Sequence, residues 1–324
     1  MSLAGSVVVP TYRRPELLGR CLAALAAQNL PAENYEVLVA DDADDEAKRR
    51  QVETFATQAK CVVRYLPVTG AHGPAAARNV GWRAARAPVI AFTDDDTIPQ
   101  PVWLTAGVGA FQRDADLAAV TGQVVVPLPD RPTDYERNEA GLEYAEFVTA
   151  NCFCRRDMLE SLGGFDERFT AAWREDSDLH FRLLQSGAKL IKVPTAAVVH
   201  PVRPAPWGIS LRMQRKSMFD ALLYKKHPAL YRKHIWRLPP LDYYLIVLCV
   251  LAVLIAGAAG NLALAVVAAV LWTGLMLRFL GRRLCGTSHA PIHVLEMLAT
   301  SLLIPFLSVF WRLYGAVKFR VWFC

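Results

Sequence analysis

Charged side chains are scarce in this sequence. Of its 324 residues, 20% are Asp, Glu, Lys or Arg, and 53% are hydrophobic. From Tyr243 to Leu277 there is no Asp, Glu, Lys, Arg or His at all. A protein that is soluble throughout does not leave so long a run without charge, so we expect part of the chain to lie in lipid.

This apolar stretch is too long for one membrane-spanning helix. As a single helix it would extend about 52 Å, whereas the hydrocarbon core of a bilayer is about 30 Å thick. Gly257, Gly260 and Asn261 lie near its middle, where they favour a turn. We therefore predict a hairpin of two short membrane helices within residues 243–277.

Basic residues stand on both sides of the hairpin, and the chain carries a net charge of +6. Because Lys and Arg are enriched in cytoplasmic flanks, we expect both ends of the hairpin and the N-terminal region on the cytoplasmic side of an inner (cytoplasmic) membrane. This placement favours a membrane surface over nucleic acid as the partner. The flanking cations are Lys225, Lys226, Arg232, Lys233, Arg237, Arg278, Arg282 and Arg283.

A third apolar stretch, residues 292–310, contains Glu296 and Pro305. If it spanned the bilayer, the cations that follow it, from Arg312 onward, would lie on the side opposite to the other basic residues. A spanning helix and a re-entrant or interfacial helix both remain open for this segment.

Two kinds of feature are absent or unorganised. The N-terminal apolar run is only Val7 to Val9, so we expect no signal peptide. The seven cysteines are odd in number and scattered, which favours reduced thiols. Cys152 and Cys154 have no second pair nearby, and we interpret them as small strand residues rather than zinc ligands.

Residues 1–200 alternate between short β-branched runs and helical patterns. This alternation predicts an α/β fold with a mostly parallel, Rossmann-like sheet and flanking helices. The expected strands are 6–10, 35–41, 62–66, 89–93, 119–126 and 189–193, and the expected helices are 15–28, 45–59 and 74–85. A basic amphipathic connector, 201–240, and the membrane region, 241–324, follow.

Two polar segments accompany this pattern. Residues 127–138 are rich in proline and predict a mobile loop over the site. In the connector, apolar side chains are expected to lie on a membrane surface while cations face the headgroups. The apolar set is Trp207, Leu211, Phe219 and Leu223, and the cations are Arg212, Arg215 and Lys216.

Three adjacent aspartates, Asp94, Asp95 and Asp96, follow the fourth expected strand. Left unpaired, each would raise the pKa of the others, whereas a divalent cation removes the repulsion. Asp94 and Asp96 are two positions apart and can present hard oxygen ligands to Mg²⁺ or Mn²⁺, which in turn binds a diphosphate. A solvated acidic turn, or an Asx-turn that caps the next segment, is the simpler alternative.

A second acidic group opens the helical pattern near residue 175. Asp176 and Asp178 lie in its first turn. Negative charge there stabilises a helix by about 0.3–1 kcal/mol without any chemistry. On this segment alone, the helix-dipole explanation is sufficient.

Taken in order, seven segments resemble the inverting family 2 glycosyltransferases of the GT-A fold, in their membrane-anchored bacterial form. The resemblance covers residues 5–200. The segments are VVVPTYRRPELLGRCLAAL, VLVADDADD, HGPAAARNVGW, AFTDDDT, NCFCRRDMLESLGGFDERF, WREDSDLHFRLLQSG and VVHP.

The resemblance implies a nucleotide-sugar site with a divalent metal, Mn²⁺ or Mg²⁺. Asp94 and Asp96 match the D-x-D metal motif, and His200 matches a late histidine that helps to bind metal or diphosphate. For His200, a hydrogen-bonded strand-end histidine without ligand function is the alternative. The residues implied at the nucleotide are Pro10, Thr11, Tyr12, Asp42 or Asp41, Arg78, Asp94 and Asp95.

On the acceptor side, Asp176 matches the catalytic base and Glu175 its catalytic neighbour. The base takes the proton from the acceptor hydroxyl while the metal stabilises the leaving diphosphate. The residues implied in the sugar and acceptor pocket are Asn151, Gly164, Trp173 and Asp178.

We therefore expect transfer of a sugar, from a UDP-sugar by preference, to a membrane-associated lipid or glycan acceptor in envelope synthesis. The segment MQRKSMF stands where processive relatives have Q-x-x-R-W, which argues against a polymer synthase. The first strand is followed by PTYRRPE without glycine, which argues against nucleotidyl transfer. Transfer to a polyprenyl phosphate held by Arg203 and its neighbouring cations, and a non-catalytic nucleotide-binding scaffold, remain as alternatives.

Overall fold

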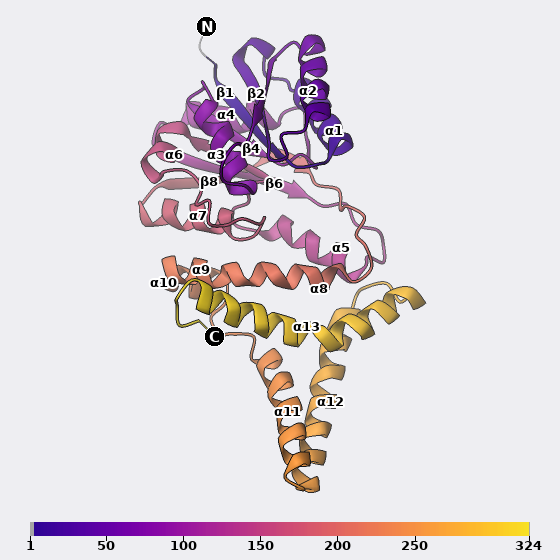
Figure 1. Cartoon of the computed structure of the whole chain (residues 1–324). Helices are drawn as coiled ribbons and strands as arrows, with labels where there is room; N and C mark the ends of the chain where they lie inside the picture. Colours follow the sequence, from indigo (N-terminus) through magenta and orange to yellow (C-terminus); the bar gives the residue numbers. More distant parts are fainter. Residues whose placement is uncertain (1–2, 324) are drawn as a thin grey trace. The chain divides into compact units, whose positions relative to one another are not determined.

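The computed structural model describes residues 3–323, which form two compact units (Figure 1). Unit 1 contains the chain up to Pro127 and Ala140–Val202, and unit 2 contains Leu128–Glu139 and the chain from Arg203. The short segment 128–139 therefore belongs with the C-terminal helices, although the chain on both sides of it belongs to unit 1.

Unit 1 is built on one eight-stranded sheet of order β3-β2-β1-β4-β7-β6-β8-β5. Four strand pairs are parallel, and three, which involve β5 and β7, are antiparallel. The strands are β1 (Gly5–Thr11), β2 (Tyr35–Asp41), β3 (Val62–Pro67), β4 (Val89–Thr93), β5 (Ile98–Pro99), β6 (Leu117–Val125), β7 (Asn151–Arg155) and β8 (Lys189–Val199).

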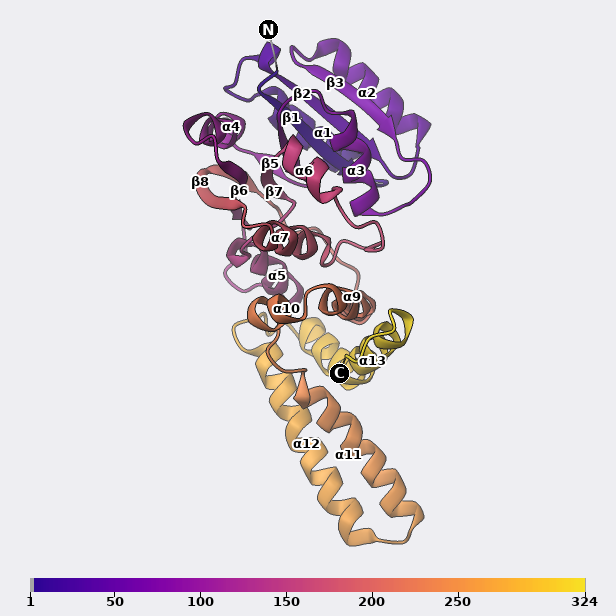
Figure 2. The ribbon, with the colours of Figure 1, turned by 90° about the vertical axis from the view of Figure 1, so that its left-hand side faces the viewer.

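Helices cover both faces of this sheet, because its central strands are apolar on both faces. Val7 and Val9 of β1 belong to one hydrophobic core, whereas Val8 between them belongs to the other. This arrangement confirms the expected α/β fold with flanking helices (Figure 2). The helices are α1 (Pro15–Ala26), α2 (Glu46–Gln58), α3 (Pro74–Ala84), α4 (Trp103–Arg113), α6 (Arg156–Leu162) and α7 (Glu175–Gln185), with short 3₁₀ turns η1 (Ala32–Asn34) and η2 (Ala140–Tyr144).

Three strands differ from the expectation, because β5 and β7 were not among the predicted strands and β8 is longer than predicted. Strand β8 continues to Val199, six residues further than the pattern predicted, and pairs with β6 through an irregular register. Strand β7 carries Cys152 and Cys154, both fully buried, which confirms that these cysteines are strand residues. β7 lies between β4 and β6 and runs antiparallel to both, so the short apolar run of this segment forms a buried central strand.

The carboxyl ends of the parallel strands meet at one edge of the sheet, where open α/β sheets bind their ligands. Thr11 at the end of β1 pairs in register with Asp41 at the end of β2. Ile98 of β5 pairs with Val199 of β8, which brings the acidic turn before Ile98 beside His200. The sheet thus gathers at one edge residues that are separated by almost 200 positions in the chain.

Unit 2 is helical. Residues 127–138 were expected to be a mobile loop over the site, but Asp134–Glu139 form helix α5, and residues 128–139 belong to unit 2. Two hydrogen bonds from Arg283 to the Asp134 carboxylate, at 2.8 and 3.2 Å, hold this helix to the C-terminal region. The other elements are α8 (Ile209–Met213), η3 (Gln214–Ser217), α9 (Met218–Lys226), α10 (Pro228–His234), α11 (Leu241–Ala258), α12 (Leu262–Leu284) and α13 (Pro291–Lys318).

Helices α11 and α12 form the expected hairpin, and Gly260 in the turn between them has a φ of +72°. Asp242 at the start of α11 accepts hydrogen bonds from Arg278 and Arg282 at the end of α12, which closes the base of the hairpin. Helices α11, α12 and α13 are each long and apolar enough to cross a membrane. These three helices are the basis for membrane association of the chain.

Helix α4 gives a direct test of core packing in unit 1. A Cβ atom built at Gly107 would overlap the ring of Phe153, whereas one at Gly109 on the same helix would meet only the end of Arg113, at 3.3 Å. We expect Gly107→Ala to destabilise the protein by about 1–3 kcal/mol through overpacking. Chemical unfolding in detergent, followed by fluorescence, measures the change. Gly109→Ala is the matched control, and equal stability of the two variants would contradict this account of the core.

Candidate functional site

Two carboxylates and one imidazole meet at the ligand-binding edge of the sheet. Asp94 and Asp96 lie on the turn between β4 and β5, and His200 follows β8. One ligand atom from each of the three residues lies within 4.8 Å of the other two. The His200 Nε2 atom is 3.5 Å from an oxygen of Asp96.

The chemistry of this cluster fits a divalent cation. Carboxylate oxygens are the ligands preferred by Mg²⁺ and Mn²⁺, and neutral imidazole is a common additional ligand for transition metals. His200 is 6% exposed, and its Nδ1 atom has no hydrogen-bond partner among residues 3–323. The ring is therefore not committed to a purely structural role, and the expected metal ligands are all brought together.

Asp95, the middle aspartate, points to different partners. It accepts a hydrogen bond of 2.7 Å from the Thr11 hydroxyl and one of 3.2 Å from Arg14. Burial raises the pKa of Asp95 to about 6, although the Arg14 guanidinium lowers it. Arg14 also lies 3.6 Å from Asp96, so one cation is shared between two acids. The sequence did not single out Arg14, because Arg13 precedes it and spacing alone does not distinguish them.

Arg78 connects the metal cluster to the second acidic group. Its guanidinium donates to Asp94 at 2.7 Å and to Glu175 at 3.0 Å. The side chain is 2% exposed, and the two carboxylates hold the pKa of Arg78 above its ordinary value despite burial. The sequence resemblance placed Arg78 at the nucleotide or its phosphates, which stays a prediction, and its partners in the structure are the two acids.

The second acidic group lies at the start of α7, and the backbone conformation just before the helix sets the direction of its side chains. Arg174, just before the helix, has a φ of +76°, a left-handed conformation that is rare outside glycine and is found at functional turns. Glu175 is buried, while Asp176 remains partly exposed and accepts from the Ser177 amide at 2.6 Å. The Oε2 atom of Glu175 has no partner among the described residues.

Burial raises the pKa of both of these acids, because nearby partners do not fully offset the cost of burying their charges. It raises the pKa of Glu175 to about 7, with a further contribution from the nearby Asp176 charge that Arg78 opposes. It also raises the pKa of Asp176, while the Ser177 amide, Arg174 and Arg78 act in the opposite direction. Raised pKa values of this kind are frequent among catalytic acids and bases.

Asp41 and Asp42 follow β2 but have different surroundings. Asp41 is fully buried and accepts hydrogen bonds from Lys48 at 2.6 Å and Tyr65 at 2.9 Å, as well as from two backbone amides. Asp42 is partly exposed and holds the exposed His72 and the Gly73 amide, each at 2.9 Å. Both carboxylates accept hydrogen bonds, but Asp41 is fully buried whereas Asp42 reaches the surface, so Asp42 is the more accessible of the two to a ligand.

Three residues expected in the acceptor pocket are engaged within the protein. Asn151 is fully buried, donates to the Gln123 and Ala196 carbonyls and accepts from Trp103. Asp178, also fully buried, pairs with Arg182 at 2.8 Å. Gly164 has a φ of +72° in the turn after α6. The buried side chains of Asn151 and Asp178 thus stabilise the framework around the predicted acceptor pocket, and contact of these residues with a substrate stays a prediction.

The remaining expected residues offer surface. Pro10 at the end of β1 is partly exposed, and the next aromatic, Tyr12, is 48% exposed. Trp173 precedes the second acidic group, and the Arg174 guanidinium stacks over its ring at 4.5 Å. Aromatic faces of this kind pack against nucleobases and sugar rings.

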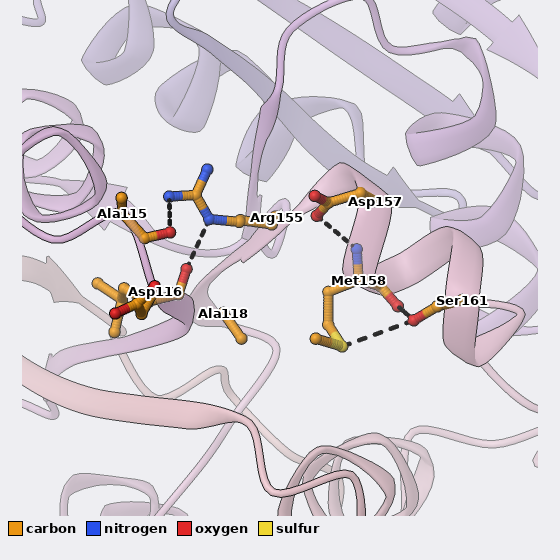
Figure 3. A pocket seen from close by; sticks show the side chains of 8 residues that line it. Ala115, Asp116, Ala118, Arg155, Asp157, Met158 and Ser161 are labelled. Carbon is orange, nitrogen blue, oxygen red and sulfur yellow. Dashed lines mark hydrogen bonds between the residues drawn. The ribbon is translucent and has the colours of Figure 1, made fainter.

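A separate pocket lies at the other edge of the sheet, where β6 begins and β7 ends (Figure 3). In it, Arg155 donates to the Ala115 and Leu117 carbonyls, and Ser161 donates to the Met158 carbonyl. The pocket contains neither the metal-ligand cluster nor the acid pair of α7, so the acidic edge is the candidate site.

Two family models match the chain. "Glycosyl transferase family 2" matches residues 6–163, and "Glycosyl transferase family group 2" matches residues 89–313. A solved structure, the mannosyltransferase PcManGT from Pyrobaculum calidifontis in complex with GDP-Man and Mn²⁺, aligns with a TM-score of 0.63. The alignment covers 97% of this chain and 88% of that one at 20% identity, which shows a shared fold.

Three curated relatives are similar in sequence. Glycosyltransferase AglE of Haloferax volcanii is 29% identical, over 61% of this chain and 67% of the relative. Validoxylamine A glucosyltransferase of Streptomyces hygroscopicus subsp. jinggangensis is 26% identical, over 71% and 63%. Pre-mycofactocin glycosyltransferase of Mycobacterium tuberculosis is 30% identical, over 61% and 43%. The chain spans less than two thirds of the length of the last two relatives.

Metal binding tests the cluster directly. We expect Asp96→Asn to weaken Mn²⁺ binding at least about tenfold, a loss of about 1.4 kcal/mol, because the variant lacks one anionic ligand. Electron paramagnetic resonance of free Mn²⁺ in a titration measures this affinity. Asp130→Asn makes the same change of charge at an exposed residue that is not one of the three predicted ligands. Equal Mn²⁺ affinity of the two variants would remove Asp96 from the site.

Proposed function

The chain belongs to the family 2 glycosyltransferases, and from its site we propose an inverting, metal-dependent transfer of a sugar from a nucleotide sugar to a membrane-associated acceptor. Its mixed sheet with helices on both faces is the GT-A-like fold of such enzymes. One observation carries the proposal: Arg78 joins the Asp94 end of the metal cluster to the acid pair of α7 at 2.7 and 3.0 Å.

The donor is proposed to bind along the carboxyl ends of β1 and β2. Pro10 and Tyr12 offer an apolar and aromatic surface for the base, and Asp42 offers a carboxylate for the base or ribose. We retain UDP as the first expectation, and the GDP-Man in the aligned structure makes GDP the other nucleotide to test. A donor panel must therefore contain both classes.

Asp94, Asp96 and His200 would hold a divalent cation, Mn²⁺ or Mg²⁺, which would neutralise charge on the leaving diphosphate. The Mn²⁺ in the aligned structure supports this assignment. The Arg14 guanidinium lies between the Asp95 and Asp96 carboxylates and reduces the repulsion between them. The Thr11 hydroxyl holds Asp95 in place through a hydrogen bond. These contacts hold the turn that carries the proposed metal ligands.

Asp176 is proposed to act as the base. Its carboxylate takes the proton of the acceptor hydroxyl as that oxygen forms a bond to the anomeric carbon, and the bond from this carbon to the diphosphate oxygen breaks. Attack from the face opposite the diphosphate inverts the configuration. Glu175 and Arg78 are proposed as positioning residues, because Arg78 holds Glu175 and Glu175 precedes the base.

A membrane-associated acceptor is proposed because the same chain carries three helices long and apolar enough to cross a bilayer. An acceptor that shares the bilayer with the enzyme meets it at a high effective concentration. The proposed location is the cytoplasmic face of an inner membrane in envelope synthesis, supported by the basic residues on both flanks of the hairpin.

Asp176→Asn tests the base. We expect kcat to fall by about 10²–10⁴-fold, the usual contribution of a positioned base, while Mn²⁺ binding stays near that of the parent. Release of nucleoside diphosphate from UDP- and GDP-sugars, in membranes that supply the acceptor, measures the rate. Asp130→Asn is the matched control. Full activity of Asp176→Asn would contradict the assignment.

The pH profile tests the environment of the acid pair. Burial raises the pKa of Asp176 above its ordinary value of 3.8 and raises that of Glu175 to about 7. The base is therefore deprotonated only at a higher pH than an ordinary aspartate, and we expect kcat/KM to rise with pH along a limb that is centred above about pH 4. In Glu175→Gln the neighbouring charge is gone, and the rising limb should move to lower pH. A limb that is centred near 4 in the parent, or that does not move in the variant, would refute this description.

A further inference from the structure

Helix α13 separates large apolar side chains from polar ones on two opposite faces. Its outward face carries the aliphatic or aromatic residues Ile292, Leu295, Leu302, Phe310, Leu313 and Val317, which are 45–78% exposed. Its inward face includes Thr300, Ser301, Ser308 and Arg312, all buried. Such an arrangement is opposite to that of a helix facing water, so the outward face requires an apolar environment.

The chain from Gly208 to Lys225 runs beside α13 over most of its length. Glu296, near the start of α13, accepts a hydrogen bond of 2.7 Å from the Gly208 amide. Near its end, Arg312 lies 3.6 Å from the Asp220 carboxylate. Beyond this pair, the Lys225 ammonium donates to the Phe319 carbonyl at 2.8 Å. Elements α8, η3 and α9 therefore accompany α13 in the same direction.

This accompanying segment is strongly basic. Arg212, Arg215 and Lys225 are exposed along it. If α13 crossed the bilayer, these cations would be carried through the hydrocarbon core with it, where charge is strongly disfavoured. If α13 lies along the membrane surface, the same cations lie at the level of the headgroups, where anionic lipid attracts them.

The contacts of α13 with the hairpin indicate that α13 lies across the two hairpin helices and does not run parallel to them. Ile304, at the middle of α13, packs against Ile246 of α11 and against Met276 and Phe279 of α12, which all lie in the half of the hairpin next to its base. The far half of the hairpin remains exposed, for example at Leu254. Both ribbon views show α13 lying across the base of the hairpin and not alongside it (Figure 2).

The end of the chain returns to the segment that precedes the hairpin. The Phe323 ring lies 5.3 Å from that of Tyr224 and 5.6 Å from that of Tyr231, between ring centroids. Tyr224 and Tyr231 come before α11, and Phe323 comes after α13. A chain that ended on the far side of a bilayer could not make these contacts.

We propose that α13 does not cross the membrane but lies within the interface of the leaflet from which the hairpin enters, with its outward face against lipid. The partner of this face is the boundary between headgroups and acyl chains. Cation–π contacts place Arg215 at 5.8 Å from the Trp311 ring and Lys318 at 6.0 Å from the Tyr314 ring. Such amphipathic pairs are typical of that boundary. The proposal is independent of the transfer reaction.

Depth measurements along α13 test this topology. Leu295, Leu302 and Leu313 are each replaced by cysteine and labelled with a fluorophore in the full chain, reconstituted in phospholipid vesicles. The parent carries Cys285→Ser and Cys324→Ser, because the other five cysteines are buried. Leu248→Cys, exposed near the middle of α11, is the deep control. Lipids brominated near the headgroup or near the acyl end quench shallow or deep labels, respectively.

An interfacial α13 gives stronger quenching by the shallow lipid at all three positions and stronger quenching by the deep lipid only at Leu248. A spanning α13 gives a label at Leu302 as deep as that at Leu248, which would overturn the proposal. Absence of quenching by either lipid at the three positions would also overturn it. As a second measurement, a protease site added after Cys324 should be cleaved in sealed vesicles from the side that exposes unit 1, and protection from that side would refute the proposal.

Discussion

The site is organised by one buried cation. Arg78 donates to Asp94 at the end of β4 and to Glu175 at the start of α7, two acids that are 81 positions apart in the chain. Burial of a guanidinium without partners would cost much free energy, so Arg78 and its two carboxylates hold one another in place. The metal ligands and the acid pair are therefore parts of a single electrostatic unit, and displacement of either would leave Arg78 uncompensated.

This unit is short of positive charge. Asp94, Asp95, Asp96, Glu175 and Asp176 supply five carboxylates, whereas the nearby guanidinium groups in the described contacts are those of Arg14, Arg78 and Arg174, with the His200 ring 3.5 Å from Asp96. The carboxylates that serve the fold have opposite properties. Burial alone would raise the pKa of Glu36, but hydrogen bonds from Arg86 and Ser6 lower it. Burial would likewise raise the pKa of Asp41, but a hydrogen bond from Lys48 lowers it. Incomplete compensation thus distinguishes the acids of the site from those of the scaffold.

Sequence reasoning succeeded where a local pattern has one structural solution. Alternating apolar runs predicted the parallel strands and the side on which they end, and Asp94 and Asp96 were found because three acids follow a buried strand. It failed where a tertiary partner decides the role. Asp41 and Asp42 follow the same strand, and only the position of the Lys48 ammonium, 2.6 Å from Asp41, separates them.

The same reason explains the other differences. Residues 127–138 were predicted to be a loop because nothing local shows that Asp134 pairs with Arg283, 149 positions later. Nothing in the sequence indicated that the Asn151 amide bridges two strand carbonyls. Arg14 was missed because its partners, Asp95 and Asp96, are distant in the chain. Long-range polar pairs of this kind have no periodicity and leave no signal in a single sequence.

In unit 2, the charged residues next to the apolar stretch of the hairpin form ion pairs. Asp242 with Arg278 and Arg282, and Asp134 with Arg283, lie at the two ends of the charge-free stretch of the hairpin. The 18 residues of α11 extend about 27 Å, close to the thickness of the hydrocarbon core, so the hairpin has no length left for polar groups inside it. On the buried polar face of α13, Thr300 and Ser301 accept hydrogen bonds from Arg283 of α12, and Arg312 pairs with Asp220 of the basic segment beside the helix. Our proposal for α13 therefore rests on the pairing of these polar and charged groups as well as on hydropathy, because unpaired polar groups are strongly disfavoured in hydrocarbon.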